Sequence, residues 1–510
     1  MDSLIPAEIS RYNAGDVLLE RAVRGGTRLL RCESRHCSGS EVAARALALQ
    51  RQLQTLGLRE GDRVLLVLRD TPAFYAGFLG AMRGGMIPIP VSTLSPPKDL
   101  AFIAADAEVA AVLLDGVLPD ATRDPCLYPT RTSILLVDGW EIEGADPTAA
   151  GEPPAATTRA TDPAFWLYTS GTTGEPKGVI HRHIDLPVTA QAVGCGVLGM
   201  GPEDRVLSAP KLFFAYGLGN SLTFPLFLGA EVVLQPERPT PEVMFELLRT
   251  EAPTLFFGVP TLYAAMLAHP ELPASLGSVR LCMSAGEALA APLYERWRDR
   301  FGVEIIDTLG TTEMLHGFLA NRPGQARPGS SGKPVPGYEL RIVDGAGADV
   351  AKSEIGTLLV RGESGARMYH KRPEQTARTM LADGWLRTGD SYRRDDEGFY
   401  YHMGRSDDLM KVSGQYVSPV EVEATLIAHP GVVEAAVVAQ ADEYGLLKPK
   451  AHVVLKSDAR PSEDLAAELQ EFVKDRIAPH KYPRWIEFTD ALPKTATGKI
   501  QRYLLRRERA

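Results

Sequence analysis

The sequence lacks the features that mark membrane, secreted and nucleic-acid-binding proteins. No run of about 18 uncharged apolar residues occurs, so we expect no membrane span. The opening residues, Met-Asp-Ser-Leu-Ile-Pro, include no basic region followed by a long apolar run, and we therefore expect no signal peptide. The formal net charge is −9, which provides no general basic surface for nucleic acid.

Cysteine is scarce and shows no pattern. The five cysteines form an odd number, which excludes a complete disulfide framework, and no zinc-binding spacing occurs. A reducing compartment fits this usage, so we expect a cytoplasmic enzyme. The cysteines are Cys32, Cys37, Cys126, Cys195 and Cys282.

Length and local patterns indicate a multidomain α/β protein. The chain has 510 residues, which suggests two or three domains. Helices are expected at residues 41–56 and 71–84, and strands at residues 64–68 and 110–114. This alternation predicts parallel sheets covered by helices. Further strands are expected at Arg205–Ser208, Glu231–Leu234, Thr254–Gly258 and Arg280–Ser284.

The pattern changes toward the C-terminus. From about residue 327, short β segments predict a β-rich subdomain. Small and charged residues at 404–408 indicate a hinge near Asp407, and a compact α+β unit follows. We predict an N-terminal domain of residues 1–404 and a C-terminal domain of residues 405–510. Elements of the α+β unit are expected at 420–428, 433–440, 450–456, 463–478 and 484–489.

A glycine-rich segment is the most informative feature of the chain. Residues 168–178 read Tyr-Thr-Ser-Gly-Thr-Thr-Gly-Glu-Pro-Lys-Gly, after an apolar run of strand character. Glycines let a backbone approach a phosphate closely, and hydroxyl groups, main-chain N–H groups and Lys177 bind its oxygens. It is not an ordinary P-loop, because Lys177 follows Pro176 and no Ser or Thr comes after it. We interpret it as a triphosphate loop; the alternative is a surface turn. The predicted binding residues are Thr169, Ser170, Gly171, Thr172, Thr173, Gly174 and Lys177.

This segment resembles the phosphate loop of the adenylate-forming superfamily, which includes acyl-CoA synthetases, aryl-CoA ligases, stand-alone adenylation domains and luciferases. Similar motifs recur in order along nearly the whole chain, from residues 58–64 to residues 493–499. The resemblance implies a large N-terminal domain that binds carboxylate and nucleotide, and a small mobile C-terminal lid. It also implies that ATP, Mg²⁺ and coenzyme A take part in the reaction.

Residues 308–313, Thr-Leu-Gly-Thr-Thr-Glu, resemble the family's second nucleotide motif. By that resemblance Glu313 holds Mg²⁺, which takes hard oxygen ligands, and Thr312 binds the α-phosphate. The alternative is a helix N-terminus capped by threonine. Many relatives have an adenine-stacking aromatic residue where this chain has Leu309, so adenine is expected to rely on apolar and main-chain contacts. The implied nucleotide contacts are Gly286, Glu287, Asp307, Thr308 and Leu309.

Two later motifs resemble the family's ribose and catalytic-lysine sites. Asp390 ends a Thr-Gly-Asp turn and resembles the carboxylate that accepts both ribose hydroxyls, with Arg405 assisting. The alternative for Asp390 is ordinary turn chemistry. Lys499 resembles the lysine that bridges the carboxylate and the α-phosphate, where a cation offsets developing charge.

The remaining motif concerns the lid and coenzyme A. Asp407 lies where the family has its hinge, and a hinge needs a few residues that absorb backbone rotation. Ser413 and Gly414 resemble the segment that leaves room for the pantetheine arm. The alternative for Gly414 is a plain turn.

Residues 211–219, Lys-Leu-Phe-Phe-Ala-Tyr-Gly-Leu-Gly, resemble the family's acid-binding motif. Together with residues 312–316, their sequence is most similar to that of benzoate-CoA ligases. The alternatives are that the aromatic residues belong to the core and that His316 is structural. The implied ring-binding residues are Phe214, Ala215, Tyr216, Gly217, Ala285, Gly310 and His316.

The resemblance therefore implies an AMP-forming ligase for an aromatic acid. We expect benzoate or a substituted benzoate such as 2-aminobenzoate to become an aroyl adenylate and then aroyl-CoA. The alternative is a stand-alone adenylation enzyme that loads a separate carrier protein. A monomer or homodimer without a nucleic-acid or membrane partner is expected.

Overall fold

The computed structural model describes residues 10–25, 29–33, 35–149, 151–170, 175–405, 408–412, 415–443, 446–456, 459–494 and 500–506. Eight predicted site residues lie outside the described residues: Gly171, Thr172, Thr173, Gly174, Asp407, Ser413, Gly414 and Lys499.

A nine-stranded sheet forms the centre of the larger part. Its six middle strands are parallel, and short antiparallel strands close both edges. The spatial order is β16 (Lys333–Pro334), β15 (Gly317–Ala320), β14 (Ile305–Gly310), β13 (Leu281–Ser284), β12 (Leu255–Gly258), β10 (Arg205–Ser208), β11 (Glu231–Leu234), β1 (Leu30–Cys32) and β2 (Arg35–Cys37).

Helices cover both faces of this sheet. On one face Met244, Tyr263 and Trp297 from three helices pack into a common apolar cluster with β12. These helices are α9 (Pro241–Thr250), α10 (Pro260–Leu267) and α11 (Ala291–Phe301). The other face packs against α6 (Asp185–Thr189), α7 (Ala215–Leu218) and α8 (Phe224–Leu228), with the π-helical segments η2 (Ala190–Cys195) and η3 (Gly219–Thr223) between them.

A second sheet has five strands, four of them parallel. It consists of β4 (Ile87–Pro90), β3 (Arg63–Val67), β5 (Ala111–Asp115), β6 (Ser133–Asp138) and β7 (Glu141–Ile142). Every residue of α3 is buried, which explains why that helix is apolar on all sides. A capping box of Ser38 and Glu41 starts α2. The helices around this sheet are α1 (Ala14–Arg24), α2 (Gly39–Thr55), α3 (Pro72–Arg83), α4 (Pro97–Asp106) and α5 (Asp120–Arg123), with the 3₁₀ turn η1 (Pro125–Leu127).

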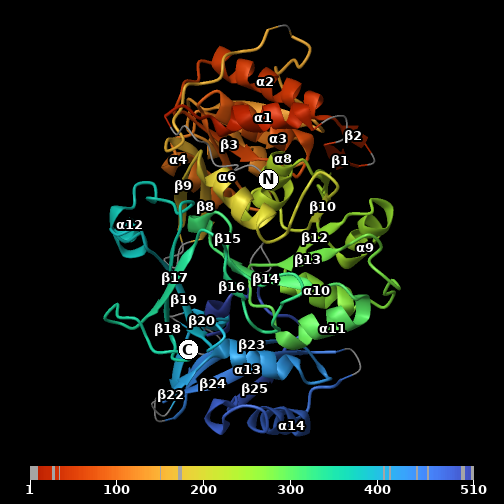
Figure 1. The fold of residues 1–510 in the computed structure, drawn as a ribbon, viewed down its shortest axis with the longest axis vertical. Helices are drawn as coiled ribbons and strands as arrows, with labels where there is room; N and C mark the ends of the chain where they lie inside the picture. The colour runs from red at the N-terminus through yellow and green to blue at the C-terminus, as the bar shows by residue number, and fades with distance from the viewer. Residues whose placement is uncertain are drawn as a thin grey trace.

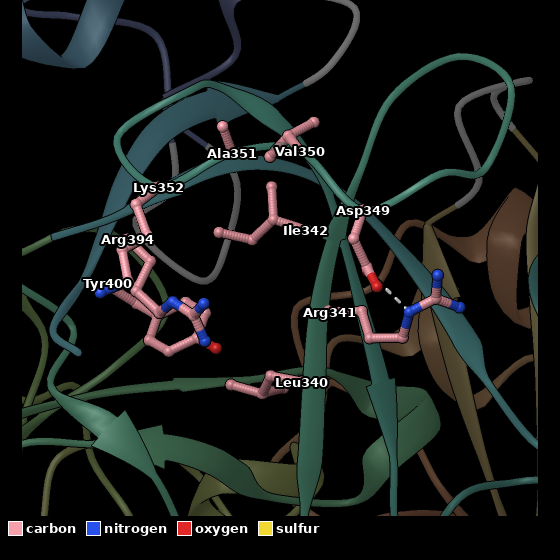
Figure 2. A pocket seen from close by; sticks show the side chains of 9 residues that line it. All are labelled: Leu340, Arg341, Ile342, Asp349, Val350, Ala351, Lys352, Arg394 and Tyr400. Carbon is pink, nitrogen blue, oxygen red and sulfur yellow. Dashed lines mark hydrogen bonds and ion pairs between the residues drawn. The ribbon is translucent and has the colours of Figure 1, made fainter. Parts of the chain in front are cut away.

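The β-rich subdomain is a four-stranded antiparallel sheet. Its strands are β17 (Glu339–Val343), β18 (Gly356–Arg361), β19 (Leu386–Arg394) and β20 (Tyr400–Arg405), and α12 (Pro373–Thr379) lies beside β19. Figure 2 shows side chains that line a hollow on this subdomain, among them Arg341 and Asp349. The hollow has a volume of about 200 Å³, and Arg341 donates to Asp349 at 2.8 Å. No predicted site residue lines this hollow.

The C-terminal part has its own hydrophobic core, which includes Leu426, Val437, Val453 and Leu469. Strand β20 ends at Arg405, one residue beyond the predicted boundary. The elements that follow are β21 (Met410–Val412), β22 (Gln415–Val417), α13 (Pro419–Ile427), β23 (Val432–Ala441), β24 (Leu447–Leu455), α14 (Glu463–Lys474), η5 (Pro479–Lys481), β25 (Trp485–Phe488) and α15 (Arg502–Leu505).

Figure 1 shows this smaller part in blue, with α13 beside α11 of the larger part. The predicted α/β class, with parallel sheets, a β-rich subdomain and a small C-terminal α+β part, is confirmed. Within the described ranges, no helix is both long enough and apolar enough to cross a bilayer. All five cysteines lie in the described part of the chain, and none of them forms a disulfide there.

Candidate active site

The glycine-rich segment joins two paired strands and includes the end of one and the start of the next. Strands β8 (Pro163–Ser170) and β9 (Pro176–Arg182) are antiparallel, and Thr169 is the cross-strand partner of Lys177. Phe165 and Leu167 alternate into the core and fix the strand's orientation. The hairpin therefore holds Thr169 and Lys177 side by side, next to its last paired positions, Ser170 and Pro176.

Lys177 faces the second nucleotide motif. Its Nζ lies 3.7 Å from Glu313 Oε1, although the two residues belong to distant segments. Burial lowers the pKa of Lys177, and the Glu313 carboxylate opposes that shift. A paired cation and carboxylate at this position suit a metal-bound phosphate group, because each can exchange its partner for the ligand.

Glu313 lies in a short 3₁₀ turn, η4 (Thr312–Met314), directly after β14. Thr311 begins the turn, and its hydroxyl accepts from the Met314 main-chain N–H at 3.2 Å. The His181 ring lies 2.9 Å from the Thr312 carbonyl oxygen through Nε2 and fixes the other side of the turn. The threonine cap, Thr311, and the predicted metal-binding carboxylate, Glu313, thus occur in one turn.

Three other residues of this motif occupy different environments. Asp307 is buried, burial raises its pKa to about 8, and its Oδ1 has no hydrogen-bond partner among the described residues. Thr308 donates its hydroxyl to the Leu319 carbonyl at 2.8 Å, so that proton is already used within the protein. Leu309 is partly buried against the core.

Asp390 and Arg405 are cross-strand partners on β19 and β20. Arg405 Nη1 donates to Asp390 Oδ1 at 3.1 Å, and His402 Nε2 lies 3.6 Å from the same oxygen. Burial opposes ionisation of Asp390, but His402 and Arg405 outweigh it and hold its pKa below the usual range. Gly389 has φ 77° and leaves room for Arg405, which a Cβ would approach within 2.6 Å. The site therefore presents an ionised carboxylate, which can accept hydroxyl groups.

Gly286 and Glu287 follow β13 and face the C-terminal part. Gly286 has φ 93°, which glycine adopts without strain. The Glu287 carboxylate accepts a hydrogen bond from the Ile500 main-chain N–H at 3.1 Å. Lys494 and Ile500 form a β-bridge around the motif that contains Lys499. This contact places Ile500 beside Glu287, one of the predicted nucleotide contacts.

The acid-binding motif forms α7 and the π-helical segment η3. Ala215 and Tyr216 lie in the first turn of α7, and the Tyr216 hydroxyl donates to the Met283 carbonyl at 3.0 Å. Phe214 precedes the helix and is partly exposed. A Cβ on Gly217 would lie 2.0 Å from the Lys211 carbonyl oxygen, so close packing requires glycine there. Ala285 is buried at the end of β13.

His316 is packed between two glycines. A Cβ on Gly219 would lie 2.4 Å from His316 Cδ2, and a Cβ on Gly310 would lie 2.7 Å from its main-chain carbon. The His316 ring centroid lies 5.5 Å from that of Tyr216, and Nε2 lies 3.2 Å from Asn220 Oδ1. Burial lowers the pKa of His316 to about 3, so the ring is neutral near pH 7. Of the predicted ring-binding residues, Tyr216 and Gly310 thus lie against a neutral histidine.

No group of three or more His, Cys, Asp or Glu side chains that would hold a metal ion occurs in the described part of the chain. A single carboxylate still fits Mg²⁺, because this ion is usually bound through one or two carboxylates and substrate phosphates. Glu313 provides such a carboxylate beside the lysine of the phosphate hairpin.

Sequence reasoning missed three residues of this region. Tyr369 donates to Glu313, His402 supports Asp390, and Asn220 lies against His316. Tyr369 and Asn220 are 56 and 96 residues from their partners, so no local motif indicates them. Among the predicted residues that are described, Thr169, Lys177 and Glu313 meet at the hairpin, and Asp390 meets Arg405.

Comparisons with known proteins give a consistent result. The AMP-binding enzyme family matches residues 20–370, and the AMP-binding enzyme C-terminal domain matches residues 421–499. A benzoate–CoA ligase of Thauera aromatica is 48% identical over 507 residues, 97% of this chain and 96% of the relative. An anthranilate–CoA ligase of Pseudomonas aeruginosa is 38% identical over 460 residues, 88% of this chain and 87% of the relative.

Solved structures agree with these relatives. A benzoate CoA ligase from Burkholderia xenovorans LB400 superposes with a TM-score of 0.91 at 44% identity, over 97% of this chain and all (100%) of that chain. An anthranilate CoA ligase in complex with anthranoyl-AMP also has a TM-score of 0.91, at 39% identity and 97% coverage of both chains.

Proposed function

The chain belongs to the AMP-binding enzyme family, and we propose that it activates an aromatic carboxylate with ATP and transfers the aroyl group to coenzyme A. The observation that carries this proposal is the meeting of Lys177 with Glu313 beside a ring site built around Tyr216 and His316. Phosphate-binding and ring-binding groups thus share the segment from β14 to His316.

In the first half-reaction, a carboxylate oxygen of the acid attacks the α-phosphorus of ATP. A carboxylate–phosphorus bond forms, the bond to the β-phosphate oxygen breaks, and pyrophosphate leaves. Lys177 and the hairpin hold the phosphates, and Asp390 accepts the ribose hydroxyls. Glu313 would hold Mg²⁺ together with the phosphates, and the ion would supply positive charge there. Lys499 offsets charge on the attacked phosphorus, as its motif implies.

In the second half-reaction, the thiol of coenzyme A attacks the aroyl carbonyl and AMP leaves. The chain uses no covalent enzyme intermediate, so positioning is its main contribution. We propose that the C-terminal part turns about Asp407 between the two steps, which removes Lys499 and brings Ser413 and Gly414 to the pantetheine arm.

The acid we propose is benzoate or a ring-substituted benzoate such as 2-aminobenzoate. The names of the relatives support this class, which includes benzoate and anthranilate ligases. An apolar pocket separates such acids by only ~1–3 kcal/mol per small group, so the preferred substituent requires measurement. Free cysteine thiols fit the reducing cytoplasm that we propose as the location.

AMP formation from ATP, measured with a panel of benzoates and short fatty acids, tests this function. The expected result is turnover that requires coenzyme A and favours one benzoate. Aroyl adenylate formation without a response to coenzyme A would instead support a carrier protein as acceptor. Turnover with fatty acids alone would contradict the aromatic-acid proposal. A Lys177→Ala variant is the matched negative control, because it removes the phosphate-binding cation.

A further inference from the structure

Tyr369 lies between two side chains that face the nucleotide. Its hydroxyl donates to Glu313 Oε1 at 2.5 Å, and Lys177 Nζ lies 3.9 Å from the centroid of its ring. Lys177 Nζ is also 3.7 Å from the same Glu313 oxygen. The three side chains therefore contact one another. Tyr369 is only 3% exposed, whereas the side chains of Lys177 and Glu313 are 18% and 14% exposed.

The main chain around Tyr369 is fixed on both sides. The His370 N–H donates to the Gly178 carbonyl at 2.8 Å, which ties this segment to the phosphate hairpin. The Ala366 N–H donates to the Glu313 carbonyl at 2.8 Å, which ties it to the metal-binding turn. The segment therefore joins the two motifs, and Tyr369 lies at the junction.

The two carboxylate oxygens of Glu313 differ in their surroundings. Oε1 accepts from Tyr369 and faces Lys177, whereas Oε2 has no hydrogen-bond partner among the described residues. A hydroxyl that holds one oxygen fixes the rotation of the whole carboxylate. Tyr369 thus determines which oxygen remains available to a metal ion.

We infer that Tyr369 is a positioning residue for the metal-bound nucleotide. Its hydroxyl orients Glu313 toward Mg²⁺, and its ring holds Lys177 in place for the phosphates through a cation–π contact. This inference rests on the proposed ATP-dependent function. It adds that the two roles of the side chain are separable, because the hydroxyl and the ring act on different partners.

Calorimetric titration with α,β-methylene-ATP tests the inference without turnover. The titration is made in Mg²⁺ and again in excess EDTA, with the wild type, Tyr369→Phe and Tyr369→Leu. Tyr369→Phe keeps the ring and removes only the hydroxyl, and Tyr369→Leu removes both. Tyr128→Phe is the matched control, because its hydroxyl is also buried and hydrogen-bonded, to the Thr122 carbonyl, outside the site.

We expect Tyr369→Phe to weaken binding by about 10-fold in Mg²⁺ and to leave binding in EDTA unchanged, since the hydroxyl acts through Glu313. Tyr369→Leu should also weaken binding in EDTA, by about 3-fold, because Lys177 loses the ring face. Tyr128→Phe should bind as the wild type does in both conditions.

Equal affinity of Tyr369→Phe and wild type in Mg²⁺ would overturn the role of the hydroxyl, and so would an equal loss in EDTA. In a Glu313→Gln background, Tyr369→Phe should have no further effect, and a persistent effect there would also overturn it. Unchanged binding of Tyr369→Leu in EDTA would overturn the role of the ring. Absence of binding to the wild type in both conditions would overturn the proposed function itself.

Discussion

His183 makes a hydrogen bond that only its neutral form can make. Its Nδ1 accepts from the Ala14 main-chain N–H at 3.1 Å, and a protonated imidazole has no acceptor nitrogen. Burial lowers the pKa of His183 to about 4 from 6.5, against an opposing effect of Asp162. As pH falls, the unfolded chain therefore takes up this proton before the folded protein does.

The free energy of unfolding should consequently fall between about pH 6.5 and pH 4, by up to ~3 kcal/mol from this residue. His183→Asn keeps an acceptor but does not titrate, so it should lose that part of the pH dependence. Urea unfolding at several pH values measures the effect, with the exposed His36→Asn as control. An unchanged pH profile in His183→Asn would contradict this explanation.

Asp390 combines an ionised carboxylate with two basic neighbours, Arg405 and His402. Asp390→Asn keeps the size of the side chain but removes its charge. Hydrogen bonds to charged groups contribute ~1.5–3 kcal/mol, so we expect KM for ATP to rise by about 10- to 100-fold. KM for the aromatic acid should change little, because the acid binds elsewhere. A comparable rise in both constants would argue against a specific role at the ribose.

At the scale of residues, the sequence indicated those side chains that belong to local motifs. Lys177 was predicted from the glycines and hydroxyl groups around it, and Glu313 from the resemblance of residues 308–313 to a family motif. Tyr369 and His402 acquire their partners only when separate strands and loops pack together. Contacts between residues this far apart in the chain cannot be predicted from a single sequence.

At the scale of elements, the π-helical segment η3 positions the ring site. Its extra residue per turn widens the helix between α7 and α8, as such segments often do at functional sites. Gly219 begins η3, and the space it leaves is filled by the His316 ring.

Gly219→Ala should therefore disturb the acid site and spare the nucleotide site. The added Cβ would lie 2.4 Å from His316 Cδ2, so the ring must shift. Packing conflicts of this size cost ~1–3 kcal/mol, and we expect kcat/KM for the acid to fall by about 10- to 100-fold. Binding of an ATP analogue should stay within about 2-fold of the wild type. Gly201→Ala, where a Cβ meets nothing within 4 Å, is the control.

Helices and strands with a clear hydrophobic period were predictable from the sequence, and their first and last residues were less so. The strands Arg205–Ser208 and Glu231–Leu234 agree with the structure, while β12 and β13 each begin one residue later than predicted. The element predicted at 463–478 extends too far toward the C-terminus, and α14 ends at Lys474. The short strand β1 and the antiparallel edge strand β2 were not predicted, since each has only three residues.

At the scale of the whole molecule, one hydrogen bond joins the final motif to the nucleotide side. Glu287 accepts from the Ile500 main-chain N–H at 3.1 Å, and its charge also acts on Arg502. This contact favours the orientation in which Ile500 lies against the larger part. The bond must break if the C-terminal part turns as we propose.

Glu287→Ala should therefore slow aroyl adenylate formation by about 10-fold, the effect of one charge-assisted hydrogen bond. Transfer from supplied aroyl adenylate to coenzyme A should be retained, because that step does not need this orientation. The two half-reactions are assayed separately, with pyrophosphate release for the first and thioester formation for the second. Equal losses in both would show that Glu287 acts on the nucleotide and not on the orientation.

The separate hydrophobic core of the C-terminal part has an evolutionary consequence. Leu426, Val437, Val453 and Leu469 pack with one another and not with the larger core, so the smaller part is a transferable module. Substitutions around His316 leave this separate core intact. A lineage can therefore acquire a new acid specificity by drift in the longer part of the gene, while recombination near residue 405 exchanges the shorter part as a unit.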